Sequence, residues 1–464
     1  MFTLNRRHAL KALGGGFGMF GLASLLGANA PTTGPLAPKQ PHFPPKAKRV
    51  AFLFLNGAVS HVDSFDPKPA LTRYNGKPSP IGNPKTERKT GNLMASPFEF
   101  KQYGQSGIPV SSLFPKLGAM IDDMCVIRSM HTDIPNHPPS LVMMNCGRNV
   151  IGTPSFGSWI TYGLGTENQN LPGYVVLCPG RLAPPASQLW GSAFLPAIYQ
   201  GTPITNHGDI NNPEKLIPFL RNSKFNNKQQ ASQLELLRAL NQENLNKSHG
   251  DPELEASIQS MEVAYTMQKE AMDAFDIRKE TQATRDRYGD HDFGRGCLLA
   301  RRLLEHGVRV VQAYYGRAEI WDHHEDIMMH QQMAPAADQA ISAFLQDLKS
   351  TSLFKDTLVV IGSEFGRTPT AEVSVRQFLQ NGRDHNPYGY SMLLAGGGIK
   401  GGITYGATDD FGWYAIDKPV HVHDLHATML HQLGFDHTKL TYQYSGRPFR
   451  LTDVEGVVVK DIIA

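Results

Sequence analysis

The hydrophobic positions of this 464-residue chain fall into short, continuous apolar runs separated by longer stretches with helical spacing. A strand that is apolar at every position suits the centre of a sheet covered on both faces, which is the usual environment of parallel strands. Helical stretches lie between several of these runs, so the order of elements favours a mostly parallel α/β sheet flanked by helices. The predicted strands are residues 49–55, 124–128, 174–177, 308–314, 357–361 and 391–395.

One long segment departs from this pattern. Residues 215–288 are rich in Gln, Asn and Glu, and their apolar side chains repeat with helical period, as Ile258, Met261 and Tyr265 illustrate. We interpret the segment as a helical insertion in the α/β domain. It is either a packing subdomain, which is the favoured interpretation, or a substrate lid or partner surface. Residues 293–308 form a further amphipathic helix that leads directly into a predicted strand.

The first 30 residues have the composition of an export signal. Arg6 and Arg7 form a twin-arginine pattern, an apolar run follows, and a small-residue cleavage site ends at Ala30. This order is typical of a Tat signal peptide, which is removed after export and is no membrane span. The mature chain is therefore expected in the periplasm or secreted, without a transmembrane segment. The predicted organisation is a signal peptide at 1–30, a proline-rich linker at 31–48, and a domain at 49–464.

The charge balance and the cysteines restrict the classes of function. Residues 1–30 contain three of the 45 lysine and arginine residues and no acid, so the mature chain carries 42 basic and 42 acidic side chains. A protein that wraps nucleic acid needs a basic excess, so we expect no nucleic-acid partner. The cysteines are not spaced as CxxC pairs, which excludes a zinc ribbon and leaves disulfide pairing open. They are Cys125, Cys146, Cys178 and Cys297.

A proline-stiffened turn at residues 136–148 feeds a short apolar helix. Pro138 and Pro139 suit the first helical turn, where their missing N–H groups would have no intrahelical partner. His137, immediately before them, is therefore held at the positive end of a helix, where spare amide donors attract anions. Gly147 is the expected end of the helix. This pattern therefore places His137 where a helix end attracts anions.

Polar side chains follow the predicted strands at the edge where α/β proteins bind ligands. The sequence WDHHED at 321–326 combines carboxylates with imidazoles and suits zinc or another divalent metal, with a solvated loop as the alternative. After the next strand, Glu364 and Arg367 either form a structural ion pair or take part in the site, where Arg367 would clamp an anionic ester. Asp384 and His385 stand just ahead of the last predicted strand.

Taken in order, these motifs resemble the exported DUF1501 family, a sulfatase-like branch of the alkaline phosphatase superfamily. The run HPPSLVMMNCGR at 137–148 is similar to the sulfatase signature, with His137 in place of the modified Cys or Ser nucleophile. Three more elements add to the resemblance, which covers residues 49–460 apart from the insertion and implies an alkaline-phosphatase/sulfatase-like fold. They are HVDSFDPKP at 61–69, GSEFGRTP at 362–369, and a late helix within 420–434 with Asp424 as its expected N-cap.

The resemblance also implies a set of site residues. One divalent metal is expected at Asp322, His324 and His385, with Asp384 beside them. A second metal site is left open. Glu364 would be one of its ligands, and Asp63 or His61 would replace the acid that the family has at the position of Asn56. Zinc is the leading expectation, with calcium and manganese as alternatives. The remaining implied residues are catalytic His137, Arg367 and Asp63 and substrate-binding His61, Asn56, His323 and His423.

His137 cannot become the formylglycine of a sulfatase, which leaves three roles open. A neutral imidazole could attack phosphorus or sulfur, His137 could protonate the leaving oxygen beside a metal-activated nucleophile, or the site could only bind an anion. We expect an exported, metal-dependent hydrolase of sulfate esters, with sulfated carbohydrate as the leading substrate class. The alternatives are a phosphomonoesterase or phosphodiesterase that uses the same groups, and a non-catalytic relative that binds an anionic glycan or a partner.

Overall fold

The computed structural model describes residues 35–180, 185–205, 273–316, 319–373 and 381–464, together with isolated positions between 216 and 243. The predicted signal peptide and most of the insertion predicted at 215–288 therefore lie outside the described residues. At the end of the insertion the structure contains α10 (Gln282–Tyr288). No helix in the described part of the chain combines the length and apolar content that a bilayer crossing requires.

A nine-stranded sheet forms the centre of the domain, and all its strands run parallel except β13, which is antiparallel to both its neighbours. This confirms the predicted mostly parallel α/β sheet, and each of the six predicted strands is present. The strands in spatial order are β14 (Ile403–Tyr405), β5 (Met124–His131), β13 (Tyr390–Ala395), β9 (Thr357–Gly362), β1 (Arg49–Phe54), β8 (Val310–Tyr314), β6 (Tyr174–Leu177) and β7 (Thr202–Ile204), with β17 (Val420–His421) pairing with the end of β5.

The two faces of the sheet are both apolar because its strands carry apolar side chains at consecutive positions. In β1, Ala51 and Leu53 belong to one core cluster, whereas Phe52 and Phe54 belong to the other. Alternate side chains of a strand point to opposite faces, so a continuous apolar run needs a cover on each side. The two clusters are therefore the two hydrophobic cores, one on each face of the sheet.

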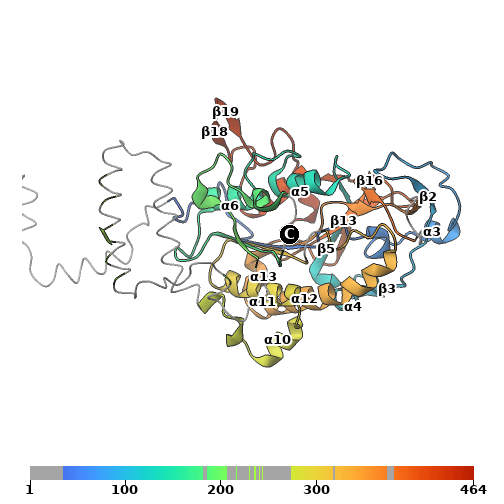
Figure 1. Ribbon diagram of the computed structural model, residues 1–464, viewed down its shortest axis with the longest axis horizontal. Helices are drawn as coiled ribbons and strands as arrows, with labels where there is room; N and C mark the ends of the chain where they lie inside the picture. Colours follow the sequence, from blue (N-terminus) through green and yellow to red (C-terminus); the bar gives the residue numbers. More distant parts are fainter. Residues whose placement is uncertain are drawn as a thin grey trace, which may run out of the picture.

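Helices provide the covers. On one face lie α5 (His137–Cys146), α6 (Phe156–Leu164) and α14 (Val422–Gln432), and on the other lie α11 and α12 with shorter helices (Figure 1). The elements of the second face are α4 (Pro115–Gly118), α11 (Asp292–Glu305), α12 (His330–Ser350) and α13 (Leu353–Asp356), to which α10 is added. A small satellite core packs α3 (Pro69–Arg73) against residues near β2 (Thr90–Leu93).

Short two-stranded pairs join the loops at the rim of the domain. They are β2 with β11 (Thr370–Glu372), β3 (Phe100–Tyr103) with β4 (Ile108–Ser111), β10 (Gly366–Arg367) with β12 (His385–Asn386), β15 (Ala407–Thr408) with β16 (Ala415–Asp417), and β18 (Tyr442–Tyr444) with β19 (Arg447–Phe449). The segment expected as a linker also lies along the domain, since Lys39 N donates to Leu164 O at 2.9 Å and Phe43 N to Gly434 O at 3.1 Å.

Strand direction decides where the polar segments meet. Because β1, β8 and β9 are parallel, the residues that follow them emerge at one edge of the sheet. β5 runs in the same direction and delivers the start of α5 to that edge. β13 runs the opposite way, so the segment that precedes it, with His385, reaches the same edge. This convergence places the predicted site residues near one another.

Helix α5 ends where the sequence predicts, at Gly147, which has φ of 66° and provides the C-cap. A Cβ there would lie 2.1 Å from the carbonyl oxygen of Leu451, so the position requires glycine for space as well as for backbone conformation. Two histidines of α14 complete the cap. His423 Nε2 donates to Gly147 O at 2.7 Å, and His426 Nε2 donates to Met144 O at 2.9 Å.

The cap of α14 corrects a prediction. Asp424 is not the N-cap, because the helix begins at Val422 and His421 is the capping residue. His421 Nδ1 accepts from His423 N at 3.2 Å, and Asp424 Oδ2 accepts from His421 N at 2.9 Å, which forms a reciprocal capping box. The four cysteines are buried, and no disulfide joins any two of them.

Candidate metal centre and active site

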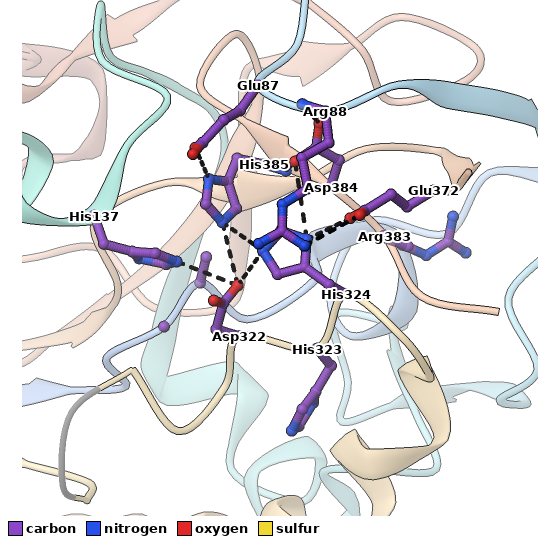
Figure 2. A network of polar contacts seen from close by, with 12 residues as sticks. Glu87, Arg88, His137, Asp322, His323, His324, Glu372, Arg383, Asp384 and His385 are labelled. Atoms are coloured by element: carbon purple, nitrogen blue, oxygen red, sulfur yellow. Dashed lines mark hydrogen bonds and ion pairs between the residues drawn. The ribbon is translucent and has the colours of Figure 1, made fainter. Parts of the chain in front are cut away.

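Three imidazoles converge on one carboxylate oxygen at the edge of the sheet. The Nε2 atoms of His324, His385 and His137 lie 2.8, 3.1 and 3.2 Å from Asp322 Oδ1. His324 and Asp322 come from the loop after β8, His385 from β12, and His137 from the start of α5 (Figure 2). The structure therefore brings together the three ligands expected for the first metal and adds the candidate catalytic histidine.

The other nitrogen of each ring faces an acceptor that orients it. His137 Nδ1 lies 2.6 Å from Glu364 Oε1, and His385 Nδ1 lies 2.6 Å from the carbonyl oxygen of Pro135. His324 Nδ1 contacts the carboxylate of Glu372. A carbonyl or carboxylate oxygen can only accept, so these contacts place a proton on each Nδ1, and the Nε2 atoms of His324 and His385 are left as candidate metal-binding atoms.

The donor set fits a divalent metal of the zinc type. His324 Nε2 and His385 Nε2 face each other at 3.1 Å, where neither atom can donate if both Nδ1 atoms carry the proton. Two groups of possible ligands overlap at His385, namely His137 with Asp322 and His385, and His324 with Asp384 and His385, and within each group the ligand atoms all lie within 4.8 Å of one another. Imidazole nitrogens with one carboxylate oxygen, each supported by a second layer of acceptors, are characteristic of zinc sites. Asp322, His324 and His385 are the residues that would hold it.

Burial and neighbouring charges shift the pKa values of the residues in this site in opposite directions. Burial raises the pKa of Asp322, but Arg367 and the three histidines hold it far below its usual range. Burial lowers the pKa of His137, yet the Asp322 and Glu364 carboxylates outweigh this effect and raise it to about 9. For His385, burial dominates and the pKa is lowered to about 3, assisted by the nearby Arg367.

The raised pKa of His137 gives a pH prediction for the chelator-treated protein. A group whose pKa is raised on folding adds stability below its unfolded pKa, near 6.5, and loses it as the pH rises through about 9. We expect the free energy of unfolding to fall by about 3 kcal/mol across this window. Urea unfolding at both ends of the window measures the change. The His137→Asn variant should lose most of the slope, and an unchanged slope would contradict the assignment.

Arg367 positions the centre instead of clamping substrate. Its guanidinium is fully buried and donates to Ala58 O at 3.0 Å, Gly57 O at 2.5 Å and Asp322 Oδ1 at 2.5 Å. It also donates to Arg383 O at 3.2 Å. A guanidinium saturated in this way cannot bind a substrate ester bidentately. The predicted clamp is therefore corrected to an ion pair that fixes Asp322.

Asp63 also takes a structural role in place of the predicted catalytic one. Arg383 Nε lies 2.6 Å from Asp63 Oδ2, and a second guanidinium nitrogen lies 3.1 Å from Oδ1. Both side chains are fully buried, and the Ser60 hydroxyl donates to Asp63 as well. Both carboxylate oxygens of Asp63 are thus engaged by Arg383 in a buried, bidentate ion pair. This pair connects the loop after β1 to the loop that carries His385.

The second metal expected at Glu364 is not assembled. Glu364 Oε1 is occupied by His137 Nδ1 and by Gly57 N, at 2.6 and 3.0 Å. Asn56 supplies a neutral amide whose Oδ1 lies 3.4 Å from Gly316 N. Within the described ranges, no group of three metal-ligating side chains includes Glu364. Glu364 is instead the residue that orients His137, and Asn56 joins the end of β1 to the loop leading to Asp322.

Three predicted substrate-binding histidines point elsewhere. His61 is buried and its Nε2 lies 2.9 Å from Gly412 O. His323 turns away from the centre (Figure 2) and its Nδ1 lies 2.7 Å from Nδ1 of His330. His423 caps the far end of α5, which spans ten residues and so places it roughly 15 Å from His137. Each of the three rings thus makes a contact outside the candidate centre, although Nδ1 of His61 and Nδ1 of His423 have no hydrogen-bond partner among the described residues.

Asp384 and the start of α5 differ in detail from the expectations. Asp384 belongs to a second His/Asp group with His324 and His385, but its oxygens accept from the backbone N–H groups of Arg88 and His385 at 2.7 and 2.8 Å. Its Oδ1 also lies 3.9 Å from His324 Nδ1, on the side away from Asp322 Oδ1. The start of α5 offers few amide donors, because two prolines lack N–H and Ser140 N donates to Asn136 O at 3.1 Å. The predicted amide cradle for an anion is absent there.

Several residues of the second layer had no signal in the sequence. Glu372, at the end of β11, is fully buried against His324, and Glu87 lies 2.9 Å from His385 Nδ1. Arg88 NH1 lies 3.2 Å from Glu372 Oε1. Glu372 could have been recognised if it had followed a longer hydrophobic strand. Its strand, Thr370-Ala371-Glu372, is too short to give such a pattern in the sequence.

Comparisons with solved structures find distant likenesses. A sulfatase from Pseudoalteromonas sp. is 11% identical with a TM-score of 0.36, over 84% of this chain and 68% of the other. A phosphonate monoester hydrolase from Silicibacter pomeroyi is 11% identical with a TM-score of 0.32, over 69% and 68%. An alkaline phosphatase superfamily protein from Vibrio parahaemolyticus is 9% identical with a TM-score of 0.36, over 88% and 71%.

The comparison with family models identifies the family of this chain, which the distant structural likenesses do not. No curated protein matches the sequence. One family model, described as a protein of unknown function (DUF1501), matches residues 47–463. This range includes the whole sheet and every residue of the metal centre, so the chain belongs to the DUF1501 family.

Proposed function

We propose that this protein is a metal-dependent hydrolase of sulfate or phosphate esters. One observation supports the proposal above all others: three histidines and Asp322 converge on one point, and each ring is oriented by an acceptor on its other nitrogen. The side chain of Asp322 is 25% exposed, so the centre opens to solvent on that side. Structural metal sites are closed, whereas catalytic sites keep an open position.

A bound divalent metal and the side chain of His137 would both take part in such a reaction. The metal, when bound, would add positive charge near the ester oxygens and lower the pKa of a water molecule. His137 stands beside the centre with its Nδ1 held by Glu364, so its Nε2 is directed toward the reacting group. Arg367 keeps Asp322 ionised and in place. His137 is therefore positioned either to attack the ester or to exchange a proton with it.

Sulfated carbohydrate is the substrate class that we propose first. The motif order of the sequence resembles sulfatases, and an anionic ester matches a centre in which a bound divalent metal would add positive charge. We also propose that the reaction takes place in the periplasm or outside the cell, since the twin-arginine pattern at Arg6 and Arg7 is typical of export.

A panel of para-nitrophenyl sulfate, para-nitrophenyl phosphate and bis-para-nitrophenyl phosphate tests the proposal on zinc-, calcium- and manganese-loaded protein. We expect turnover of at least one ester, with the sulfate ester fastest, and loss of turnover after treatment with a chelator. If the phosphate monoester or diester is hydrolysed fastest, we would assign the same mechanism to phosphoryl substrates. An absence of turnover with every metal would overturn the hydrolase and favour a protein that only binds anions.

A further inference from the structure

A short basic segment lies across one side of the metal centre. We call residues 85–89, with the sequence KTERK, the basic strap. Glu87 Oε2 lies 2.9 Å from His385 Nδ1, and the backbone N–H of Arg88 donates to Asp384 Oδ2 at 2.7 Å. Figure 2 shows both strap residues next to the two residues of the centre that they contact. The strap is therefore one side chain away from the metal ligands.

Both ends of the strap are fixed. The carbonyl oxygen of Lys85 accepts from the Tyr388 hydroxyl at 3.0 Å, and that of Lys89 accepts from Val373 N at 2.8 Å. These contacts hold the backbone in one place while the lysine side chains remain exposed. The strap thus presents its cations at a defined position, which an unanchored surface loop would not do.

Most of the charge that the strap exposes is positive. Both oxygens of its single acid, Glu87, are engaged, since Oε2 faces His385 Nδ1 and Oε1 accepts from Asn136 Nδ2 at 3.1 Å, and 34% of this side chain is exposed. Arg88 is partly used by Glu372, yet 46% of its side chain is exposed. Neither Lys85 nor Lys89 forms an ion pair with a residue in the described ranges. In a mature chain with equal numbers of acids and bases, this is a local excess of cations beside the site.

We propose that the basic strap binds further sulfate groups of a polysulfated glycan whose reacting ester lies at the metal centre. The inference rests on the proposed ester hydrolysis and adds a subsite for charge beyond the reacting group. A substrate with one sulfate would contact the centre alone, whereas a neighbouring sulfate on the same chain would meet Lys85, Arg88 or Lys89. Interactions between exposed charges are screened by salt, so this contribution should weaken as ionic strength rises.

Binding of dextran sulfate to the metal-loaded, full mature protein tests the subsite by calorimetry. The Lys85→Gln/Lys89→Gln variant should bind about tenfold more weakly at low salt, and the difference should shrink in high salt. The matched control is Lys101→Gln/Lys355→Gln, which removes the same charge at two exposed positions away from the strap. Equal weakening in both variants, or wild-type binding by the strap variant, would overturn the proposal.

Kinetics with two substrates separate this inference from the proposed function. The strap variant should keep the wild-type KM for para-nitrophenyl sulfate and show a raised KM for a sulfated oligosaccharide. A raised KM for both substrates would mean that the strap acts through the centre and would overturn the subsite. If the wild type hydrolyses neither, the proposed hydrolysis fails, while the calorimetric comparison still decides whether the strap recognises sulfate groups.

Discussion

The Asp322→Asn/His385→Ala variant should contain no bound divalent metal, whereas the wild type, purified without chelator, should contain about one equivalent. Two of the three proposed ligands are removed, and even the loss of one residue behind a ligand typically weakens metal binding by about ten- to a hundredfold. Mass spectrometry of the purified proteins measures the metal content. Turnover of the best ester should fall with the metal, to the level of the chelator-treated wild type.

The control for this experiment lies in the neighbouring residue. His323 precedes His324 in the sequence, but its ring contacts His330 instead of Asp322. The His323→Ala variant should therefore keep the full metal content. Near-UV circular dichroism against chelator-treated wild type shows whether the double variant still folds. A wild-type protein without metal, or a double variant that keeps it, would remove the basis of the proposed hydrolase.

The sequence was sufficient to predict which side chains meet at this edge, because they lie beside hydrophobic strands. A strand such as β8 is recognisable from its apolar run, and polar residues just beyond its end can be assigned to the ligand-binding edge of the sheet. Asp322 and His324 follow from that logic. His385 required the family resemblance as well, since it precedes β13, and an apolar run does not reveal that this strand is antiparallel.

Burial explains why two other residues predicted for the site at the same edge have structural contacts instead. Arg367 and Asp63 stand in the same motifs as the ligands and have the residue types of catalytic groups. The loops there are folded into the interior, so their backbone carbonyls need donors, and Arg367 supplies several of them. Pattern alone does not distinguish an arginine that binds substrate from one that satisfies buried carbonyls.

The second layer could not be predicted because its members come from unrelated parts of the chain. His324 is oriented by Glu372, 48 positions away, and His385 by the carbonyl oxygen of Pro135, 250 positions away. A backbone carbonyl leaves no trace in residue type. Glu87 lies in an exposed segment without periodicity, so only the three-dimensional contact with His385 reveals it.

Replacement of His137 should separate catalysis from metal binding. The His137→Ala variant keeps Asp322, His324 and His385, so we expect the metal content of the wild type. Turnover should fall by about a hundred- to ten-thousandfold if the imidazole transfers a proton, and further if it is the nucleophile. Steady-state kinetics beside metal analysis measures both quantities. Full activity in this variant would exclude a catalytic His137, and loss of the metal would make it a fourth ligand.

The two catalytic roles of His137 differ in their dependence on the leaving group. An acid that protonates the leaving oxygen matters little when that group is as good as para-nitrophenolate, so the His137→Ala defect should be much larger with an alkyl ester than with the aryl ester. A nucleophile is needed for both esters, and its loss should reduce turnover of each by the same factor.

With a phosphate ester, a covalent intermediate would add a phosphorus–nitrogen signal in rapidly quenched wild-type protein. We expect the leaving-group dependence, because Glu364 holds His137 Nδ1 at 2.6 Å and supports a protonated ring beside Asp322. Equal defects with both esters, together with the phosphorus–nitrogen signal, would assign the attack on the ester to His137 itself.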